Sequence, residues 1–127
     1  MERIRLSVMD GMFLLADTRE TPMHVGGLQV FKVPPRARAH FVANLFAKLR
    51  SFPVTLPPLN YRLTGGIAGT VMPSWQVAED VDLDYHVRHS ALPSPGGERE
   101  LGMLVSRLHS TRMDLSRPLW EYHLIEG

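Results

Sequence analysis

The chain has 127 residues, 44% of them hydrophobic and 21% charged, which is enough for one ordinary globular core. A formal net charge of +1 does not suggest a protein that binds a phosphate backbone, so no nucleic-acid partner is expected. The absence of cysteine excludes disulfides, thiolate metal ligands and a cysteine nucleophile. The sequence shows neither a secretory signal nor an apolar run long enough to cross a bilayer, so we expect a cytoplasmic protein.

A short helix is predicted to begin after Ser7. Ser7 lies three residues before Asp10, a spacing typical of a capping box, in which the hydroxyl and the carboxylate satisfy free amide groups. The apolar residues that follow recur at helical spacing, so this helix is expected to pack on one side. Its predicted buried stripe consists of Met9, Met12, Phe13 and Ala16.

Thr21-Pro22 is expected to end this helix, and Met23–Val33 is predicted to be extended and to enter a strand. Apolar residues on both faces of its second half favour a strand that is covered on each side. Pro34-Pro35 should end the strand, and a second helix is predicted from about Arg36 to Arg50. The buried stripe of that helix is expected to comprise Phe41, Val42, Leu45, Phe46 and Leu49.

The segment Phe52–Pro58 carries too many prolines for regular structure. After it, short strands are predicted at Asn60–Thr64 and Trp75–Val77, and the segment Tyr85–Leu92 leads to a turn at Pro93–Gly97. A third helix is predicted from about Glu98, because acidic residues there lie at the positive end of the helix dipole. Its apolar stripe consists of Leu101, Leu104, Val105 and Leu108.

A final strand, Trp120–Ile125, is predicted from the alternation of its side chains between two faces. Glu121 and His123 share one of these faces and could form an acid–base couple, although no nucleophile pattern accompanies them. Strands and helices thus alternate along the chain without repeats, which predicts a mixed α/β layer architecture.

The six histidines raise the question of a metal site. His86 and His89 are three residues apart, but Asp84–Ser90 is predicted to be extended, which would point them to opposite faces. Zinc needs three or four convergent ligands, so we expect no metal site and interpret these histidines as local hydrogen-bonding groups.

Three alternating acidic residues, Asp80, Asp82 and Asp84, imitate the opening of a calcium-binding loop. Such a loop also needs a glycine and a distal glutamate, at positions that here hold Tyr85 and Ala91. A solvated acidic turn is the better interpretation.

Two glycine pairs, Gly26-Gly27 and Gly65-Gly66, are similar to phosphate cradles only in composition. Neither pair has the spacing of a dinucleotide-binding loop or a P-loop, and no Gly-Lys-Ser or Gly-Lys-Thr follows. Close approach of the backbone within a sheet is the preferred interpretation.

Five segments resemble, in the same order, sequence blocks of one enzyme family. Leu6–Leu14 is similar to a Ser-x-x-Asp start, and Pro22–Leu28 to a Met-His-Val-Gly segment. Asp82–His89 and Leu104–Ser110 match later blocks, and Arg117–Glu121 is similar to a Pro-Leu-Trp motif. Each block is weak alone, but five in order over nearly the whole chain are specific. The chain resembles the N-terminal part of the bacterial wax ester synthase/diacylglycerol acyltransferase family.

The resemblance implies an α/β fold related to chloramphenicol acetyltransferase, with a mixed sheet flanked by helices and two similar halves that enclose the active site in a tunnel. Residues 1–127 would be the N-terminal portion of the first acyltransferase domain, truncated before the family's His-His-x-x-x-Asp-Gly motif. No His-His pair occurs in this sequence, so none of its residues is expected to be catalytic. The chain alone is therefore expected to be inactive.

The activity implied for the longer parent is O-acyl transfer in wax ester or triacylglycerol synthesis. A long-chain acyl group would pass from acyl-CoA to a fatty alcohol or diacylglycerol, with the second histidine of the missing motif as general base. Acyl-CoA is a substrate, and the resemblance implies no cofactor. The residues expected to contact substrate are Pro118, Leu119, Trp120, His24 and Gly26. Core packing is the competing interpretation of Trp120.

The expected protein partner is the remainder of the same enzyme, in one polypeptide or as a separate chain. Peripheral contact with the inner membrane or with lipid droplets is left open, as are two other functions. One is a non-catalytic lipid-binding or chain-complementing module, and the other is a condensation-type acyltransferase of the same fold. Arg36, Lys48 and Arg50 could meet the phosphates of coenzyme A, although a solvated helix face is the commoner meaning of such spacing.

Overall fold

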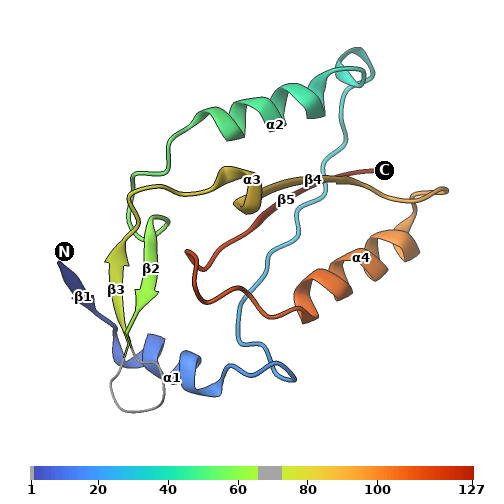
Figure 1. The fold of residues 1–127 in the computed structure, drawn as a ribbon. Helices are drawn as coiled ribbons and strands as arrows, with labels where there is room; N and C mark the ends of the chain where they lie inside the picture. Colours follow the sequence, from blue (N-terminus) through green and yellow to red (C-terminus); the bar gives the residue numbers. More distant parts are fainter. Residues whose placement is uncertain (1, 66–72) are drawn as a thin grey trace. The chain divides into compact units, whose positions relative to one another are not determined.

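A computed structural model describes residues 2–65 and 73–127 and has the predicted α/β character (Figure 1). The chain divides into two compact units that alternate along the sequence. Unit 1 comprises the described residues of Met1–His24, Val54–Val81 and His109–Trp120. Unit 2 comprises Val25–Pro53, Asp82–Leu108 and Glu121–Gly127.

Unit 1 contains an antiparallel sheet of three strands in the order β1-β3-β2. The strands are β1 (Arg3–Arg5), β2 (Tyr61–Thr64) and β3 (Ser74–Val77). The register places Ile4 and Leu63 opposite Trp75 from its two sides, so three apolar side chains share one face. The strands predicted at residues 60–64 and 75–77 are confirmed. β1 is not evident from the sequence, because three residues are too few to show an alternating pattern.

The predicted first helix is α1 (Val8–Ala16), and it begins at the expected cap. The Ser7 hydroxyl accepts a hydrogen bond from the Asp10 amide at 3.0 Å. This contact confirms the hydroxyl part of the predicted capping box.

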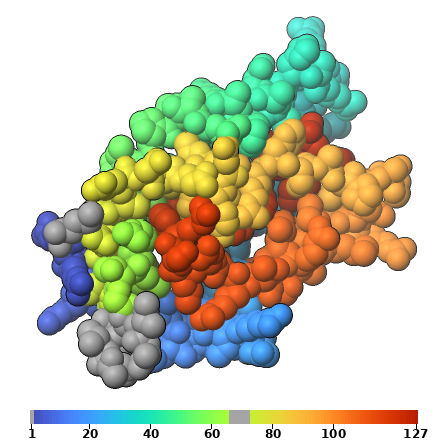
Figure 2. Space-filling model, viewed as in Figure 1, coloured from blue at the N-terminus to red at the C-terminus, as the bar shows by residue number. Residues whose placement is uncertain are grey.

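The predicted burial of α1 is wrong. Met9 and Met12 are each 65% exposed. All four residues of the predicted stripe are exposed: Met9, Met12, Phe13 and Ala16. The helix instead turns Gly11 and Leu14 inward, and it lies at the surface in Figure 2, where it is blue. Helical spacing locates an apolar stripe, but it does not decide which side of the helix finds a partner.

The strand predicted within Met23–Val33 does not form among the described residues. This segment has no regular secondary structure and is drawn in Figure 1 as a long connection between α1 and α2. Val30 and Phe31, expected to be covered, are exposed. A strand needs the hydrogen bonds of a neighbouring strand, and no described strand pairs with this segment.

Unit 2 is built on a parallel pair of strands, β4 (Val87–Ala91) and β5 (Tyr122–Glu126). The register pairs Val87 with Tyr122 at one end and Ala91 with Glu126 at the other. The predicted last strand is thus confirmed, although it begins at Tyr122 and not at Trp120, because the Trp120 amide is turned back onto the Pro118 carbonyl.

The predicted second helix begins later than expected. A single 3-10 turn, Pro35–Ala37, comes first, and α2 runs from Phe41 to Ser51. α2 contacts both β4 and β5 (Figure 1). Four of the five predicted stripe residues are half-buried and only Phe41 is exposed; the four are Val42, Leu45, Phe46 and Leu49.

The first part of Asp84–Ser90, which was expected to be extended, forms a helical turn before β4. This turn is α3 (Leu83–His86), and Asp82 caps it by accepting hydrogen bonds from the amides of Asp84 at 3.1 Å and Tyr85 at 3.3 Å. The helix predicted from Glu98 is confirmed as α4 (Glu98–Ser110). Its predicted stripe is the half-buried side: Leu101, Leu104, Val105 and Leu108. No helix formed by residues 2–65 and 73–127 is long and apolar enough to cross a membrane.

We expect Ser7→Ala to destabilise the protein by about 1 kcal/mol, because the Asp10 amide loses its acceptor and little side-chain burial holds α1 in place. Urea denaturation followed by circular dichroism measures the loss. Ser7→Asp, which keeps an acceptor oxygen, is the matched control and should stay near wild type. Equal stability of the two variants would contradict the capping role.

Candidate functional site

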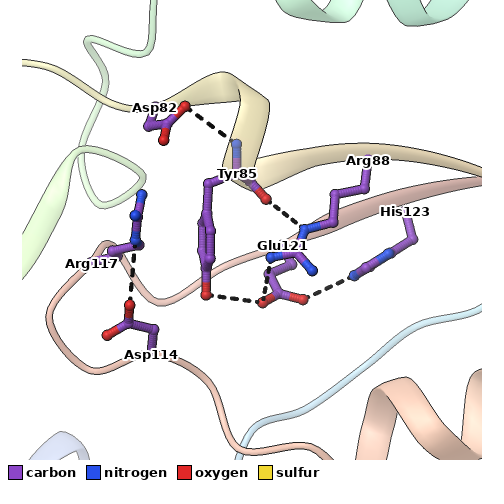
Figure 3. Close-up of polar contacts among 7 residues, drawn as sticks. All are labelled: Asp82, Tyr85, Arg88, Asp114, Arg117, Glu121 and His123. Carbon is purple, nitrogen blue, oxygen red and sulfur yellow. Dashed lines mark hydrogen bonds and ion pairs between the residues drawn. The ribbon is translucent and has the colours of Figure 1, made fainter.

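A tight turn leads into the Pro-Leu-Trp residues of unit 1. Asp114 Oδ1 accepts hydrogen bonds from the Ser116 hydroxyl at 2.6 Å and from the Ser116 amide at 2.9 Å. Arg117 Nε lies 3.3 Å from Asp114 Oδ2 (Figure 3). The two Ser116 hydrogen bonds, with the Arg117 charge, hold the pKa of Asp114 below its usual value. The turn delivers Pro118 into a buried position.

Trp120 is fixed by the backbone of unit 1. Its indole Nε1 donates a hydrogen bond to the Leu59 carbonyl at 2.8 Å, and its amide donates to the Pro118 carbonyl at 3.0 Å. Leu59 lies at the end of the proline-rich segment, next to the buried Asn60. Leu119 and Trp120 are half-buried, so each keeps some accessible surface for a further contact. Packing and ligand contact are therefore compatible at Trp120.

His24 belongs to the same unit and carries an unsatisfied buried atom. Its Nδ1 is buried and has no hydrogen-bond partner among the described residues. The edge of the ring meets His109, with ring centroids 4.9 Å apart at 83°. A buried ring nitrogen without a partner is uncommon in proteins, so a polar group outside the described residues is expected beside it.

A carboxylate that the sequence gives no reason to single out fixes the residue before His24. Asp17 accepts hydrogen bonds from the Met23 amide at 2.8 Å and from Arg112 Nε at 2.5 Å, and its carbonyl accepts a third from Arg112 Nη2 at 3.2 Å. We call this group the Asp17–Arg112 clasp. Its partners are 95 positions apart, so no local pattern reveals it.

The clasp determines the charge state of Asp17. Its side chain is only 11% exposed, and this burial by itself raises the pKa. The hydrogen bonds from Met23 and Arg112 and the positive charge of Arg112 outweigh burial, so the pKa of Asp17 lies below its usual value.

Gly26, the fifth predicted contact residue, is assigned to a different unit from the other four. It is exposed and belongs to unit 2, whereas His24 and Pro118–Trp120 belong to unit 1. Four of the predicted contact residues therefore belong to unit 1, and Gly26 belongs to unit 2.

Glu121, in unit 2, lies at the centre of a polar network (Figure 3). Its carboxylate accepts a hydrogen bond from the Tyr85 hydroxyl at 3.4 Å, forms an ion pair with Arg88 at 3.7 Å and lies 2.9 Å from His123 Nε2. Arg88 also donates from Nε to the Tyr85 carbonyl at 2.8 Å and lies over the Tyr85 ring. The predicted contact between Glu121 and His123 exists, but the carboxylate serves three groups, which favours a structural role in joining α3, β4 and β5.

The two histidines considered as metal ligands, His86 and His89, each contact another side chain of the chain. His86 is 1% exposed and packs edge-on against the Tyr85 ring. His89 Nε2 lies 2.6 Å from Glu126 on the neighbouring strand. Within residues 2–65 and 73–127, no three His, Cys, Asp or Glu side chains are grouped so that they could hold a metal ion.

One residue considered for the phosphates of coenzyme A forms an ion pair with one of the residues considered for calcium. Arg50 forms an ion pair with Asp84 and lies over the Phe46 ring. Arg36 and Lys48 are exposed, as a solvated helix face predicts. Gly66, one of the glycines considered as phosphate cradles, lies outside the described residues.

Comparison with known proteins places these features in context. A sequence model of the wax ester synthase/diacylglycerol acyltransferase catalytic domain matches residues 6–127. A probable diacylglycerol O-acyltransferase of Mycobacterium tuberculosis is 44% identical over 128 aligned residues, which cover 93% of this chain and 26% of that protein. An O-acyltransferase of Acinetobacter baylyi is 42% identical over 123 residues, which cover 96% of this chain and 25% of that protein. The chain spans about a quarter of the length of these curated relatives.

One solved structure is also closely similar. The wax ester synthase/diacylglycerol acyltransferase from Marinobacter aquaeolei VT8 superposes with a TM-score of 0.88 at 44% identity, over 98% of this chain and 29% of that chain. This match confirms the predicted α/β fold class.

We expect the Asp17–Arg112 clasp to make stability depend on pH. Because the folded pKa of Asp17 is lowered, its contribution is fully present above the unfolded pKa of about 3.9 and is lost as pH falls through the lower folded value. Asp17→Asn should cost about 1–2 kcal/mol at pH 7, since Arg112 is partly exposed and solvent screens the pair. It should also flatten the loss of stability below pH 4.

Urea unfolding at a series of pH values between 2.5 and 7 measures both effects, and these values bracket the usual carboxyl range of about 4. Asp80→Asn, at an exposed carboxylate outside the clasp, is the matched control and should keep the wild-type profile. An Asp17→Asn profile parallel to wild type would contradict the lowered pKa.

Proposed function

The chain belongs to the wax ester synthase/diacylglycerol acyltransferase family, and on this premise we propose that it forms the N-terminal part of an O-acyltransferase. The enzyme transfers a long-chain acyl group from acyl-CoA to a fatty alcohol or to diacylglycerol, and so makes a wax ester or a triacylglycerol. The observation that carries this proposal is the match of the family's catalytic domain over residues 6–127, which include all five sequence blocks.

The chemistry is displacement at a thioester. The acceptor hydroxyl oxygen forms a bond to the acyl carbon, the carbon–sulfur bond breaks, and the hydroxyl proton passes through a general base to the departing thiolate of coenzyme A. A histidine with a pKa near neutral suits this proton transfer. We assign that base to a His-His-x-x-x-Asp-Gly motif outside residues 1–127, and we propose that acyl-CoA enters as substrate with no cofactor.

Within this chain, we propose that Pro118, Leu119, Trp120 and His24 line the route of the substrate. The accessible remainder of Trp120 and Leu119 offers an apolar wall, and the unpartnered Nδ1 of His24 offers one hydrogen-bonding position. Gly26 contributes differently: it is exposed, and without a side chain it allows close approach to its backbone.

The substrates also suggest where the enzyme works. Diacylglycerol and long-chain alcohols partition into lipid, so we propose a cytoplasmic enzyme in peripheral contact with the inner membrane or with lipid droplets. The exposed apolar side of α1 is compatible with such contact. The matched family favours ester formation over the amide-forming condensation reaction as the chemistry.

We expect the polypeptide encoded by the complete reading frame to release coenzyme A from palmitoyl-CoA in the presence of hexadecanol or dioleoylglycerol. Residues 1–127 alone should be slower by at least about 10²–10⁴-fold, because they lack the general base. Thiol release and thin-layer chromatography of the lipid product measure the reaction. Equal turnover by the chain alone, from material free of longer protein, would contradict the assignment of the base.

We expect Trp120→Ala in the longer enzyme to lower stability by up to about 3–5 kcal/mol and, in the molecules that remain folded, to change the preferred acyl-chain length. Trp120→Phe is the matched control. It keeps an aromatic wall but loses the bond to Leu59, so it should cost about 1 kcal/mol and keep the chain-length preference. Melting temperatures and a series of acyl-CoA substrates separate the effects. If folded Trp120→Ala keeps the wild-type preference for acyl-chain length, Trp120 contributes only to packing and the proposed substrate contact is contradicted.

A further inference from the structure

Residues Val25–Val33, here called the open segment, form a solvent-exposed stretch rich in apolar side chains between α1 and the 3-10 turn at Pro35–Ala37. Val25 is 89% exposed, Val30 77% and Phe31 78%. Leu28 is exposed as well. Single apolar side chains on a surface need no explanation, but four exposed within seven residues indicate a candidate interaction site.

The backbone of the open segment is also unpaired. Among residues 2–65 and 73–127, no hydrogen bond joins a main-chain group of Val25–Val33 to another part of the chain. The segment therefore presents a row of free amides and carbonyls between α1 and the 3-10 turn at Pro35–Ala37. Unpaired extended backbone is a template for another strand.

The side chains fit a strand that is covered on both faces. Leu28 and Val30 fall on one face, and Phe31 and Val33 on the other, with β-branched and aromatic types prevailing. A segment that lies on a lipid surface would instead keep one polar face, rich in Lys or Arg. The only cation here is Lys32, so the sequence favours a protein partner.

We propose that the open segment is a docking strand, which pairs with a β-strand from the part of the acyltransferase domain outside residues 1–127. The occupant follows from the coverage of the relatives. This chain superposes almost entirely on the wax ester synthase/diacylglycerol acyltransferase from Marinobacter aquaeolei VT8 yet covers only 29% of it, so most of that fold remains to supply a partner strand. The inference rests on family membership and not on the proposed reaction.

Amide hydrogen exchange tests the pairing. In residues 1–127 alone, the amides of Leu28–Val33 should exchange at rates close to those of an unfolded peptide. In the polypeptide encoded by the complete reading frame, we expect protection to rise by at least about 100-fold, as for an interior strand. Amides in α4 should be protected in both samples and serve as the internal standard.

Proline substitution supplies a test that does not depend on exchange. Val30→Pro removes a ladder donor, so it should lower the melting temperature of the longer polypeptide. It should leave the stability of residues 1–127 unchanged, because no described residue accepts a hydrogen bond from that amide. Val25→Pro, at the margin of the segment, is the matched control and should have a smaller effect. The unchanged stability of the short chain excludes a general folding defect.

Four outcomes would overturn the proposal. The first is that the amides of Leu28–Val33 exchange without protection in the longer polypeptide. The second is that the reading frame ends at residue 127 and the same amides exchange without protection. Protection of the short chain by itself at rising concentration would identify a second copy as the occupant. Protection of the short chain on phosphatidylglycerol vesicles would identify a lipid surface. An inactive longer polypeptide with a protected segment would refute the proposed function and leave this inference intact.

Discussion

Parallel pairing of β4 with β5 is the constraint on which the organisation of unit 2 depends. Parallel neighbours cannot be joined by a tight turn, so the chain must leave the sheet after Ala91 and return before Tyr122 by a long connection. That connection contains α4 and the turn from Asp114 to Trp120. The Pro-Leu-Trp residues consequently lie directly before a strand, at the point where the chain enters the sheet.

Two carboxylates secure contacts between segments that are distant in sequence. Glu121 joins the start of β5 to Tyr85 and Arg88 in the α3–β4 region. Asp17 joins the segment before His24 to Arg112, 95 positions away. Each carboxylate accepts from several donors, so its desolvation is offset by charge-assisted hydrogen bonds. In unit 1, this fixes the backbone next to His24, as the substrate contact that we propose for His24 would require.

Much apolar surface remains exposed despite these contacts. The exposed side of α1 and the open segment carry most of it, and Val87 and Pro118 are the only apolar side chains that are buried among the described residues. Surface of this kind costs free energy in proportion to its area, and a partner that covers it recovers that cost. The chain spans about a quarter of the length of its curated relatives. Proteins of that length contain further residues that can cover both surfaces.

The sequence by itself determined the elements whose signals are local. The Ser7 cap, the stripe and start of α4 and the alternation of β5 each depend on residues a few positions apart, and the order of five short blocks was enough to indicate the family. Only the tertiary structure decided which side of α1 faces inward, that Arg112 holds Asp17, and that Val25–Val33 has no strand beside it among the described residues. The physical reason is the same in each case: periodicity and capping act within a few residues, whereas burial and strand pairing require a partner that local sequence does not specify.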